Sequence, residues 1–410
     1  MFALLCILCL YGNEPSKTRL IVSSILLYVT ILTKIEIGVA LSASIIFSWL
    51  AQKNTLKEKL RTTTIYFILP TFFAIGNYIL IYFIKPEVYF SFLSSLNPVK
   101  ADNKIIFSRA ISGLRDLPYN LMSWGFSLAF YLIVVVVIKA ASLISKKSID
   151  RFGFKMLPIV IFVVLIFLLR ILKWNLIYSL SQYNLLPLIS LICLAHFIYH
   201  NYRVNIPTNN KNVLGIAVAL FSFFSCMRIF FKVSVSHYGF YLIAAGFLCY
   251  YYFFFEIIPK TFDTNYEKKY YKYAFMFLMI FFTISNMQLY WKSYADRPTS
   301  IKTDKGDMKV LSYYNDYSEL LTYLNKVLKP SDTLLVLPEG VILNYFTSKR
   351  NPIYYYHVLP HDLAYDKAEE IIIKEIDTKK VDYVIIVNRF ATDYGSARFG
   401  IDYAKKYLNI

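Results

Sequence analysis

The stretch YVTILTKIEIGVALSAS, Tyr28–Ser44, places Lys34 and Glu36 inside an otherwise apolar run. A charged side chain costs about 2.5–3.5 kcal/mol or more at the centre of a bilayer. The whole run, 20–50, is also longer than the roughly 20 residues of one comfortable membrane crossing. We therefore predict that the chain turns at Lys34–Glu36 and that two short helices meet there at the membrane face. A simpler interpretation is that both charges snorkel at helix ends without any chemical role.

The composition indicates a polytopic helical membrane protein. Hydrophobic residues make up 57% of the 410 residues, and the mean hydropathy is +0.48. Stretches of about 18 or more nearly uncharged residues predict membrane-spanning helices. We expect them at about 64–84, 124–144, 156–173, 178–200, 213–233, 236–258 and 273–291. With the shorter segments 20–33 and 36–50 and the apolar start Met1–Tyr11, the expected bundle has about 8–10 spans.

The net charge of +18 comes largely from short loops between the apolar segments, so it does not indicate a nucleic-acid partner. Sixteen Lys and Arg residues lie in one set of loops, 12–19, 51–61, 145–155, 201–212 and 259–272. The alternate segments 85–123, 170–177 and 228–237 carry nine over a similar length. The positive-inside rule then places the first set in the cytoplasm and the end of the chain outside it.

The chain divides into a membrane domain, 1–292, and a polar remainder, 293–410, joined by a linker rich in charges and turn formers at 292–309. In the remainder, strand-like and helix-like segments alternate, which predicts an extracytoplasmic α/β domain with a mostly parallel sheet. We expect helices at 316–328 and 365–377, a short helix within 338–346, and strands at 333–337, 353–358 and 381–387.

One segment on the outer side, 86–123, alternates aromatic and charged residues and contains three prolines. It is too polar to span a membrane and too apolar to remain in water. We expect one or two amphipathic helices that lie at the interface as an outer loop over the bundle.

Several motifs resemble the GT-C glycosyltransferases, in particular bacterial relatives of protein mannosyltransferase and the aminoarabinose and lipopolysaccharide-core sugar transferases. The LTKIE turn at 32–36 and the outer loop are similar to features of that group. SDTLLVLPEGVILNYFTSKRNP, 331–352, and VDYVIIVNR, 381–389, resemble runs common in its C-terminal domains. QYNLLPLISLICL, 182–194, is similar to an RYxxPxxP motif, with Gln182 where arginine is usual.

The resemblance implies an inverting transfer of a sugar from a polyprenyl-phosphate-linked donor to a lipid, glycan or protein acceptor outside the cytoplasm. It implies a bacterial inner-membrane protein and an acidic general base in the first outer loop, often with a divalent cation, Mg²⁺ or Mn²⁺. This chain has no outer loop before Lys34 and no DxD motif. We therefore expect either that N-terminal spans of the family are missing or that the catalytic acid lies elsewhere.

A donor phosphate becomes a leaving group, so fixed cations near it would stabilise the transition state. The candidates on the outer side for the phosphate are Lys34, Arg109, Arg115, Arg170, Lys173, Arg228 and Lys232. Gln182, Tyr183 and His237 are candidates for contacts with the sugar or phosphate. For the base, Glu36 is the first choice and Asp116 the second, although each could instead cap a helix or pair with a neighbouring cation.

Other functions remain open at this point. Charges inside the membrane could line the path of a transporter or flippase for lipid-linked glycans, although the sequence shows only one broken helix pair. A catalytically inactive fragment or interaction subunit is a third hypothesis. In the polar remainder, Glu339 follows the strand 333–337 at its carboxyl end, where α/β sheets often place binding groups. A turn residue without a binding role is the alternative there.

Overall fold

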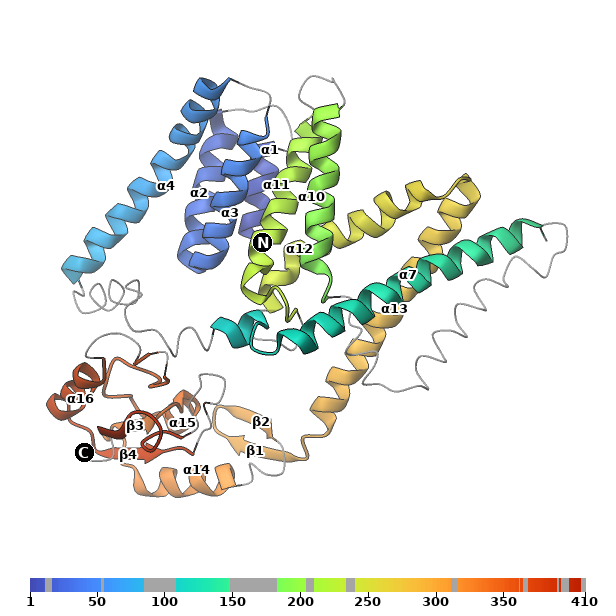
Figure 1. Cartoon of the computed structure of the whole chain (residues 1–410). Coiled ribbons are helices and arrows are strands. Elements are labelled where there is room, and N and C mark those ends of the chain that lie inside the picture. The colour runs from blue at the N-terminus through green and yellow to red at the C-terminus, as the bar shows by residue number, and fades with distance from the viewer. Residues whose placement is uncertain are drawn as a thin grey trace. The chain divides into compact units, whose positions relative to one another are not determined.

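The structure is a computed structural model that divides into two compact units (Figure 1). The first comprises Met1–Tyr89 and Ile111–Met279, and the second comprises Phe90–Ala110 and Ile280–Ile410. The residues described are 1–11, 17–52, 55–84, 108–147, 183–203, 210–233, 240–310, 316–360, 362–363, 368–388, 391 and 398–406.

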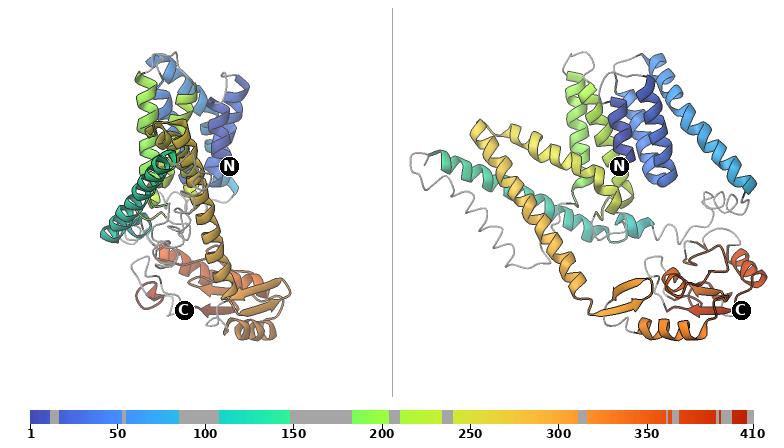
Figure 2. Two further views of the ribbon diagram at one scale, coloured as in Figure 1. Left: turned by 90° about the vertical axis from the view of Figure 1, so that its right-hand side faces the viewer. Right: turned by 180° about the vertical axis from the view of Figure 1, so that it is seen from behind.

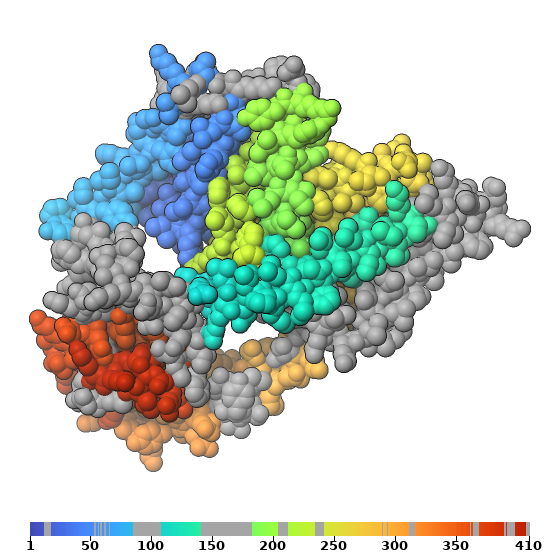
Figure 3. All heavy atoms as spheres, viewed as in Figure 1, coloured from blue at the N-terminus to red at the C-terminus, as the bar shows by residue number. Residues whose placement is uncertain are grey.

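The first unit contains a bundle of apolar helices that lie side by side in the views of Figures 1 and 2. Its members are α1 (Phe2–Tyr11), α2 (Lys17–Thr33), α3 (Ile35–Leu50), α4 (Leu56–Ile84), α10 (Leu186–Arg203) and α11 (Asn210–Cys226). Figure 3 shows α10 and α11 in close contact along their lengths, and a hydrogen bond between Ser190 and Ser222 joins them. Buried side chains of α1, α2, α3, α4 and α11 share one hydrophobic core.

Two polar contacts fix the directions of α3, α10 and α11. Near the end of α10, Asn201 Nδ2 donates to the carbonyl of Ala51, which follows α3, over 3.0 Å. At the opposite end, Arg228, just after α11, forms an ion pair with Glu36 at the start of α3. Helix α11 is therefore antiparallel to both α3 and α10. We call the two ends of the bundle the Ala51 end and the Lys34 end.

The remaining bundle helices alternate in the same way. The hydroxyls of Tyr11 and Ser48 form a hydrogen bond, so α1 runs toward the Ala51 end. Asn77 donates to the Tyr28 hydroxyl, and α4 runs beside α2 toward the Lys34 end. The connections after α1, α3 and α10 thus share the Ala51 end. These are three of the loops whose Lys and Arg content predicted a common side, and their grouping confirms that part of the topology.

A second group of helices consists of α7 (Leu117–Lys147), α12 (Ala244–Tyr252) and α13 (Asn265–Ala295), of which α13 belongs to this unit as far as Met279. The Tyr131 and Tyr250 hydroxyls form a hydrogen bond of 2.9 Å between α7 and α12. Phe254 stacks on Phe275 with ring centroids 4.3 Å apart. These aromatic contacts hold α13 antiparallel to α12.

The expected span 236–258 is not one regular α-helix in the described residues. Its described part consists of the 3₁₀ turn η3 (Phe240–Ile243), α12, the π-helix η4 (Phe253–Ile257) and the 3₁₀ turn η5 (Ile258–Thr261). The π-helix coincides with the aromatic run after α12. The rings of Phe254 and Phe255 both contact the ring of Phe275. The wider turn of the π-helix is compatible with this double contact.

The expected outer loop 86–123 ends earlier than predicted. Helix α7 begins at Leu117, so the last residues of that segment form its first turns. Pro118 lies at the start of the helix, where the missing N–H costs no hydrogen bond. Residues 108–112 are also helical and are followed by Gly113 at φ 81°. Residues 86–107 lie outside the described part.

Four helical stretches of the described chain are long and apolar enough to cross a membrane: Tyr66–Ile84, Ser108–Ala140, Asn212–Ile229 and Asn265–Lys292. Three shorter apolar helices accompany them: Phe2–Tyr11, Thr18–Thr33 and Ile35–Leu50. Many large apolar side chains on these helices are exposed, as expected of surfaces covered by lipid. The chain is thus a helical membrane protein. The predicted segment 156–173 lies outside the described residues.

The described part of the second unit contains two small sheets and three short helices besides the end of α13. Its elements are β1 (Thr299–Thr303), β2 (Gly306–Val310), α14 (Asp316–Val327), β3 (Leu334–Leu337), α15 (Val341–Thr347), α16 (Ala368–Thr378) and β4 (Tyr383–Ile386). Strands β3 and β4 are parallel, with Leu334 opposite Tyr383. The predicted helices at α14, α15 and α16, both of these strands and their parallel pairing are confirmed.

Strand β3 is buried on both faces. Leu334 and Val336 pack in one core with α14 and α15, whereas Leu335 and Leu337 pack in another with α16. This is the reason for a continuous apolar run rather than an alternating one.

Two predictions for this unit are wrong. The supposed linker contains the antiparallel hairpin β1–β2, whose turn reaches φ 124° at Gly306. Ile301 pairs with Met308, and both side chains pack in the hydrophobic core on one face of the hairpin. These two apolar positions favour a strand pair despite the charged residues around them. The expected strand 353–358 forms only an isolated bridge between His357 and Glu339. Its backbone groups are instead held in part by side chains, with Asn351 Nδ2 donating to the Tyr355 carbonyl over 2.8 Å.

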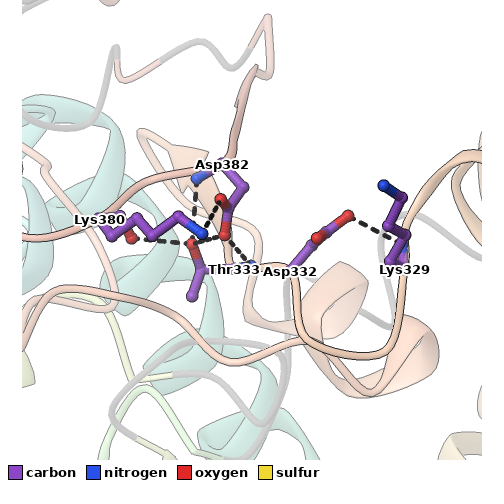
Figure 4. Close-up of polar contacts among 5 residues, drawn as sticks. All are labelled: Lys329, Asp332, Thr333, Lys380 and Asp382. Atoms are coloured by element: carbon purple, nitrogen blue, oxygen red, sulfur yellow. Dashed lines mark hydrogen bonds and ion pairs between the residues drawn. The ribbon is translucent and has the colours of Figure 1, made fainter.

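A polar network fixes the register at the amino ends of β3 and β4 (Figure 4). The Asp382 carboxylate accepts hydrogen bonds from the backbone N–H and the hydroxyl of Thr333, both at 2.9 Å. The carbonyl of Lys380 lies 2.9 Å from the same hydroxyl and is an alternative acceptor of its one proton. The Lys380 ammonium lies 3.2 Å from Asp382 Oδ1. Thr333 and Asp382 belong to the two motifs that resemble transferase C-terminal domains, and here they hold the strands together.

We expect Asp382→Asn to weaken this unit at neutral pH and to reduce its sensitivity to acid. The hydrogen bonds from Thr333 and the Lys380 ammonium hold the pKa of Asp382 below its usual value. A carboxyl with a lowered folded-state pKa contributes stability above its unfolded pKa and loses it as pH falls through the folded value. Hydrogen exchange of β3 and β4 amides in the full chain would measure this. The difference between the two proteins near pH 7 should shrink as pH falls through the lowered pKa of Asp382; a difference independent of pH would contradict the assignment.

Candidate functional site at the Lys34 end

The site is built on the turn between α2 and α3. Lys34 adopts an extended conformation, φ −159° and ψ 106°, and it alone separates the two helices. Its N–H still donates to the Thr30 carbonyl over 3.0 Å, and its carbonyl accepts from the Gly38 N–H over 3.0 Å. The predicted break in the apolar run is therefore confirmed. Both helices keep their hydrogen-bonded ends intact around a single extended residue.

Gly38 permits the close approach of α2 and α3 beneath this turn. A Cβ atom at this position would lie 2.5 Å from Ile31 Cγ1 and 2.8 Å from Ile31 Cα. These distances are far below van der Waals contact. The absence of a side chain at Gly38 therefore sets how tightly the two helices pack and how firmly the turn is held.

Glu36 is the common partner of two cations at this end of the bundle. Its Oε1 forms an ion pair with Arg228 Nη1, and its Oε2 lies 3.8 Å from Lys34 Nζ. We call Lys34, Glu36 and Arg228 the ionic cluster. Two positive charges and one negative charge leave it with a net charge of about +1.

The helix ends favour this arrangement of charges. Glu36 lies in the first turn of α3, where the partial positive charge of the helix stabilises a carboxylate. Arg228 lies in the 3₁₀ turn η2 (Met227–Ile229) after α11, where the partial negative charge favours a cation. The side chains of Lys34, Glu36 and Arg228 are 39%, 36% and 32% exposed, so the cluster remains accessible to a ligand.

The segment after Arg228 connects the cluster to the turn that precedes α7. The Phe231 N–H donates to the Ser112 carbonyl over 2.9 Å. Gly113 packs so closely that a Cβ there would lie 2.9 Å from Lys232 Cβ. Arg115 and Asp116 follow immediately in this turn, and both are exposed. One short segment therefore links the ionic cluster with two of the predicted site residues.

Hydrogen bonds from Asn120 in α7 also fix the turn that contains Asp116. Asn120 donates from its N–H to the Asp116 carbonyl over 3.0 Å and from Nδ2 to the Gly113 carbonyl over 2.7 Å. The structure gives the Asp116 carboxylate no hydrogen bond or ion pair with any residue it describes. The Asp116 carboxylate is therefore exposed on a turn whose backbone is fixed.

The loop before α10 also reaches this end of the bundle. Asn184 Nδ2 donates to the Ser123 hydroxyl in α7 over 2.7 Å. Tyr183, predicted to contact substrate, is buried, and its ring meets that of Phe247 edge to face at 5.4 Å. Tyr183 therefore has a packing role that the sequence motif did not indicate. Its burial makes direct contact with a ligand unfavourable.

The remaining predicted site residues are Arg109, Arg170, Gln182 and His237. Arg170, Gln182 and His237 lie outside the described residues. Arg109 is exposed and belongs to the second unit. The sequence did not reveal that Glu36 and Arg228, 192 positions apart, form a pair. The only signal was that both were expected at span ends on the same side.

The resemblance implies a divalent cation, which needs ligands such as carboxylates or imidazoles. Within the described ranges, no group of three His, Cys, Asp or Glu side chains is arranged to hold a metal ion. We therefore derive no step through a metal.

Comparisons with known proteins give no assignment. No protein-family model, no curated protein and no solved structure matches this chain. The function must be argued from the chemistry of the site.

Proposed function

We propose that this chain is a membrane glycosyltransferase of GT-C type that takes its sugar from a polyprenyl-phosphate-linked donor. The acceptor is a hydroxyl of a lipid, glycan or protein, and the transfer inverts the anomeric carbon. The observation that carries the proposal is the convergence of Lys34 and Arg228 on Glu36 at one end of an apolar bundle. Such a cluster suits an anionic headgroup attached to a lipid tail.

The depth of the cluster supports a lipid phosphate as its ligand. Helix α2 has 17 residues and spans about 25 Å, compared with about 30 Å for the hydrocarbon core. With Lys17 and Arg19 at its other end in the interface, Lys34 lies near the opposite headgroup region. The phosphate of a polyprenyl lipid lies at this same depth. Its tail can then follow the apolar helix surfaces.

The reaction requires charge stabilisation at the leaving group. The acceptor oxygen attacks the anomeric carbon from one face while the bond to the phosphate oxygen breaks on the other. Negative charge grows on the departing lipid phosphate, and the acceptor loses its proton to a base. Lys34 and Arg228 would stabilise that growing charge, and the planar guanidinium can donate two hydrogen bonds to one phosphate.

The ion pairs of Glu36 favour a positioning role for it. Its two oxygens already accept contacts from Arg228 and Lys34, so it can hold both cations toward one point. Asp116 is the better candidate for the proton acceptor because its carboxylate is exposed and its turn is fixed. This reverses the order of the two bases that the sequence alone favoured.

For location, we propose a bacterial cytoplasmic membrane, with the Lys34 end and the second unit on the extracytoplasmic side. The loops at the Ala51 end belong to the set of five that carries sixteen basic residues against nine in the alternate segments, which favours the cytoplasm for that end. Helix α13 runs antiparallel to α12 and leads into the second unit.

The proposal is tested by transfer from radiolabelled polyprenyl-phosphate hexoses and pentoses, with the full chain in proteoliposomes and extracted envelope lipids and glycans as acceptors. We expect transfer by the wild type, and in Asp116→Asn a kcat lowered about 10²-fold or more with little change in KM. Asp263→Asn is the matched control, because Asp263 is also exposed but follows η5 and is not part of the proposed site.

No turnover of any donor by the wild type would contradict the proposed activity. Full kcat in Asp116→Asn, together with loss of kcat in Glu36→Gln, would instead return the role of base to Glu36.

A further inference from the structure

A second polar site lies in the second unit, at the carboxyl end of β3. Glu339 follows this strand after Pro338 and pairs with His357 in an isolated antiparallel bridge. The Val358 N–H donates to the Pro338 carbonyl over 2.7 Å, which fixes the pairing. Residues directly opposite in an antiparallel pair project from the same face. The Glu339 carboxylate and the His357 imidazole therefore share one face of this edge.

Asp362 orients the imidazole. Its Oδ2 lies 2.6 Å from His357 Nδ1 and also accepts the Leu359 N–H over 2.9 Å. The hydrogen bond to Asp362 raises the pKa of His357 above its ordinary value. With Nδ1 held in this way, Nε2 is the ring atom directed away from Asp362. The side chain of His357 is partly exposed, and a ligand can reach it.

Exposed aromatic rings accompany these polar groups. Tyr356, next to His357, is 62% exposed, and Tyr354 is also exposed. The segment that carries them is fixed, because the Tyr354 N–H donates to Glu375 Oε1 over 2.9 Å. Exposed aromatic rings on a fixed segment lose little entropy when a ligand packs against them. They are exposed apolar surfaces of the same segment that carries His357.

We propose that Glu339, His357, Asp362 and Tyr356 form a saccharide-binding site. The carboxylates accept hydrogen bonds from ring hydroxyls, the imidazole bonds a further hydroxyl, and the tyrosine ring covers the apolar C–H face of the sugar. A metal ion is a poorer ligand, because among the described residues no group of three or more His, Cys, Asp or Glu side chains is placed to hold one. The position at the carboxyl end of a parallel strand is typical of binding sites in α/β folds.

This inference rests on the proposed function in one respect: the bound saccharide is taken to be part of the acceptor glycan. The ionic cluster binds the donor phosphate in the membrane unit, and the β3 edge would select the acceptor. The two sites consist of different residues in different units. They can therefore fail independently in an experiment.

The test is saturation-transfer NMR on the full chain in lipid nanodiscs, with methyl α-mannoside, methyl β-galactoside and methyl β-glucoside as probes. We expect saturation transfer to at least one probe. It should fall at least about fivefold in Glu339→Gln, His357→Gln and Tyr356→Ala, since each removes one of the few contacts that orient the sugar. Tyr323→Ala is the matched control, because Tyr323 on α14 is 60% exposed and lies outside the proposed site. Unchanged hydrogen exchange of β3 and β4 would show that the variants remain folded.

Lys34→Gln separates this inference from the proposed function. Retained saturation transfer in Lys34→Gln, with loss in Glu339→Gln, supports a site in the second unit. Loss in Lys34→Gln with full signal in Glu339→Gln would place the sugar at the donor site and overturn the inference. Absence of signal from all three probes would also overturn it, whereas the donor-transfer assay would still decide the proposed function.

Discussion

Replacement of Arg228 by glutamine is expected to lower kcat/KM for sugar transfer by about 10²-fold, the usual cost of removing a preorganised group that stabilises transition-state charge. Arg228 is the closer of the two cations to Glu36 and presents a planar guanidinium. Lys34, whose Nζ lies 3.8 Å from Glu36, should matter less, and Lys34→Gln is expected to cost about tenfold. Because both cations share Glu36, the effects of the two substitutions should not be additive.

Two comparisons make this prediction specific. Arg203→Gln removes an arginine from the last turn of α10, near the Ala51 end, and should leave kcat/KM unchanged. Arg228→Lys keeps the charge but not the two-pronged geometry, so it should recover only part of the activity. Equal losses in Arg228→Gln and Arg203→Gln would show that charge anywhere on the bundle matters, and the ionic cluster would lose its special role.

A substitution of Gly38 by alanine is expected to destabilise the first unit by about 1–3 kcal/mol. A Cβ there would lie 2.8 Å from the backbone Cα of Ile31, and a backbone atom cannot move aside as a flexible side chain can. The gain in helix propensity, about 1 kcal/mol, is smaller than this steric cost. Gly38→Val should separate α2 from α3 further and displace the Lys34 turn.

The matched control is Gly76→Ala in α4, where nothing lies within 4 Å of the added Cβ. It should be neutral or stabilising by up to about 1 kcal/mol, because only the propensity gain remains. Thermal unfolding of the full chain in nanodiscs would measure both. The loss of stability in Gly38→Ala should be accompanied by reduced sugar transfer; equal unfolding midpoints for the two variants would contradict the packing of α2 on α3.

The break at Lys34 could be predicted from the sequence because its cause is local. The apolar run is too long for one membrane crossing, and its two charges are costly inside the bilayer. A break with an extended residue at the membrane face resolves both difficulties. The strand β3 was predictable for the same reason, since a short run without polar residues requires cover on both faces. The grouping of basic loops at the Ala51 end followed from charge counts alone.

The pairing of Glu36 with Arg228 could not be predicted, because it depends on the register between α3 and α11. Periodicity in either helix does not fix that register. The π-helix at Phe253–Ile257 likewise results from aromatic packing against Phe275, which no local pattern encodes. The hairpin β1–β2 was missed although Ile301, Met308 and Gly306 carried a signal for it. Only two side chains of the hairpin face the core, and the many charged residues between them made the strand pattern hard to recognise in the sequence.

The most direct test of the ionic cluster as a lipid-phosphate site is the preference of the full chain for a polyprenyl phosphate over the uncharged polyprenol, measured by native mass spectrometry from nanodiscs. The account predicts a preference of at least about tenfold in the wild type and in Arg203→Gln, and its loss in the double variant Lys34→Gln, Arg228→Gln. An undiminished preference in the double variant would show that the phosphate binds elsewhere, and the central claim would be wrong.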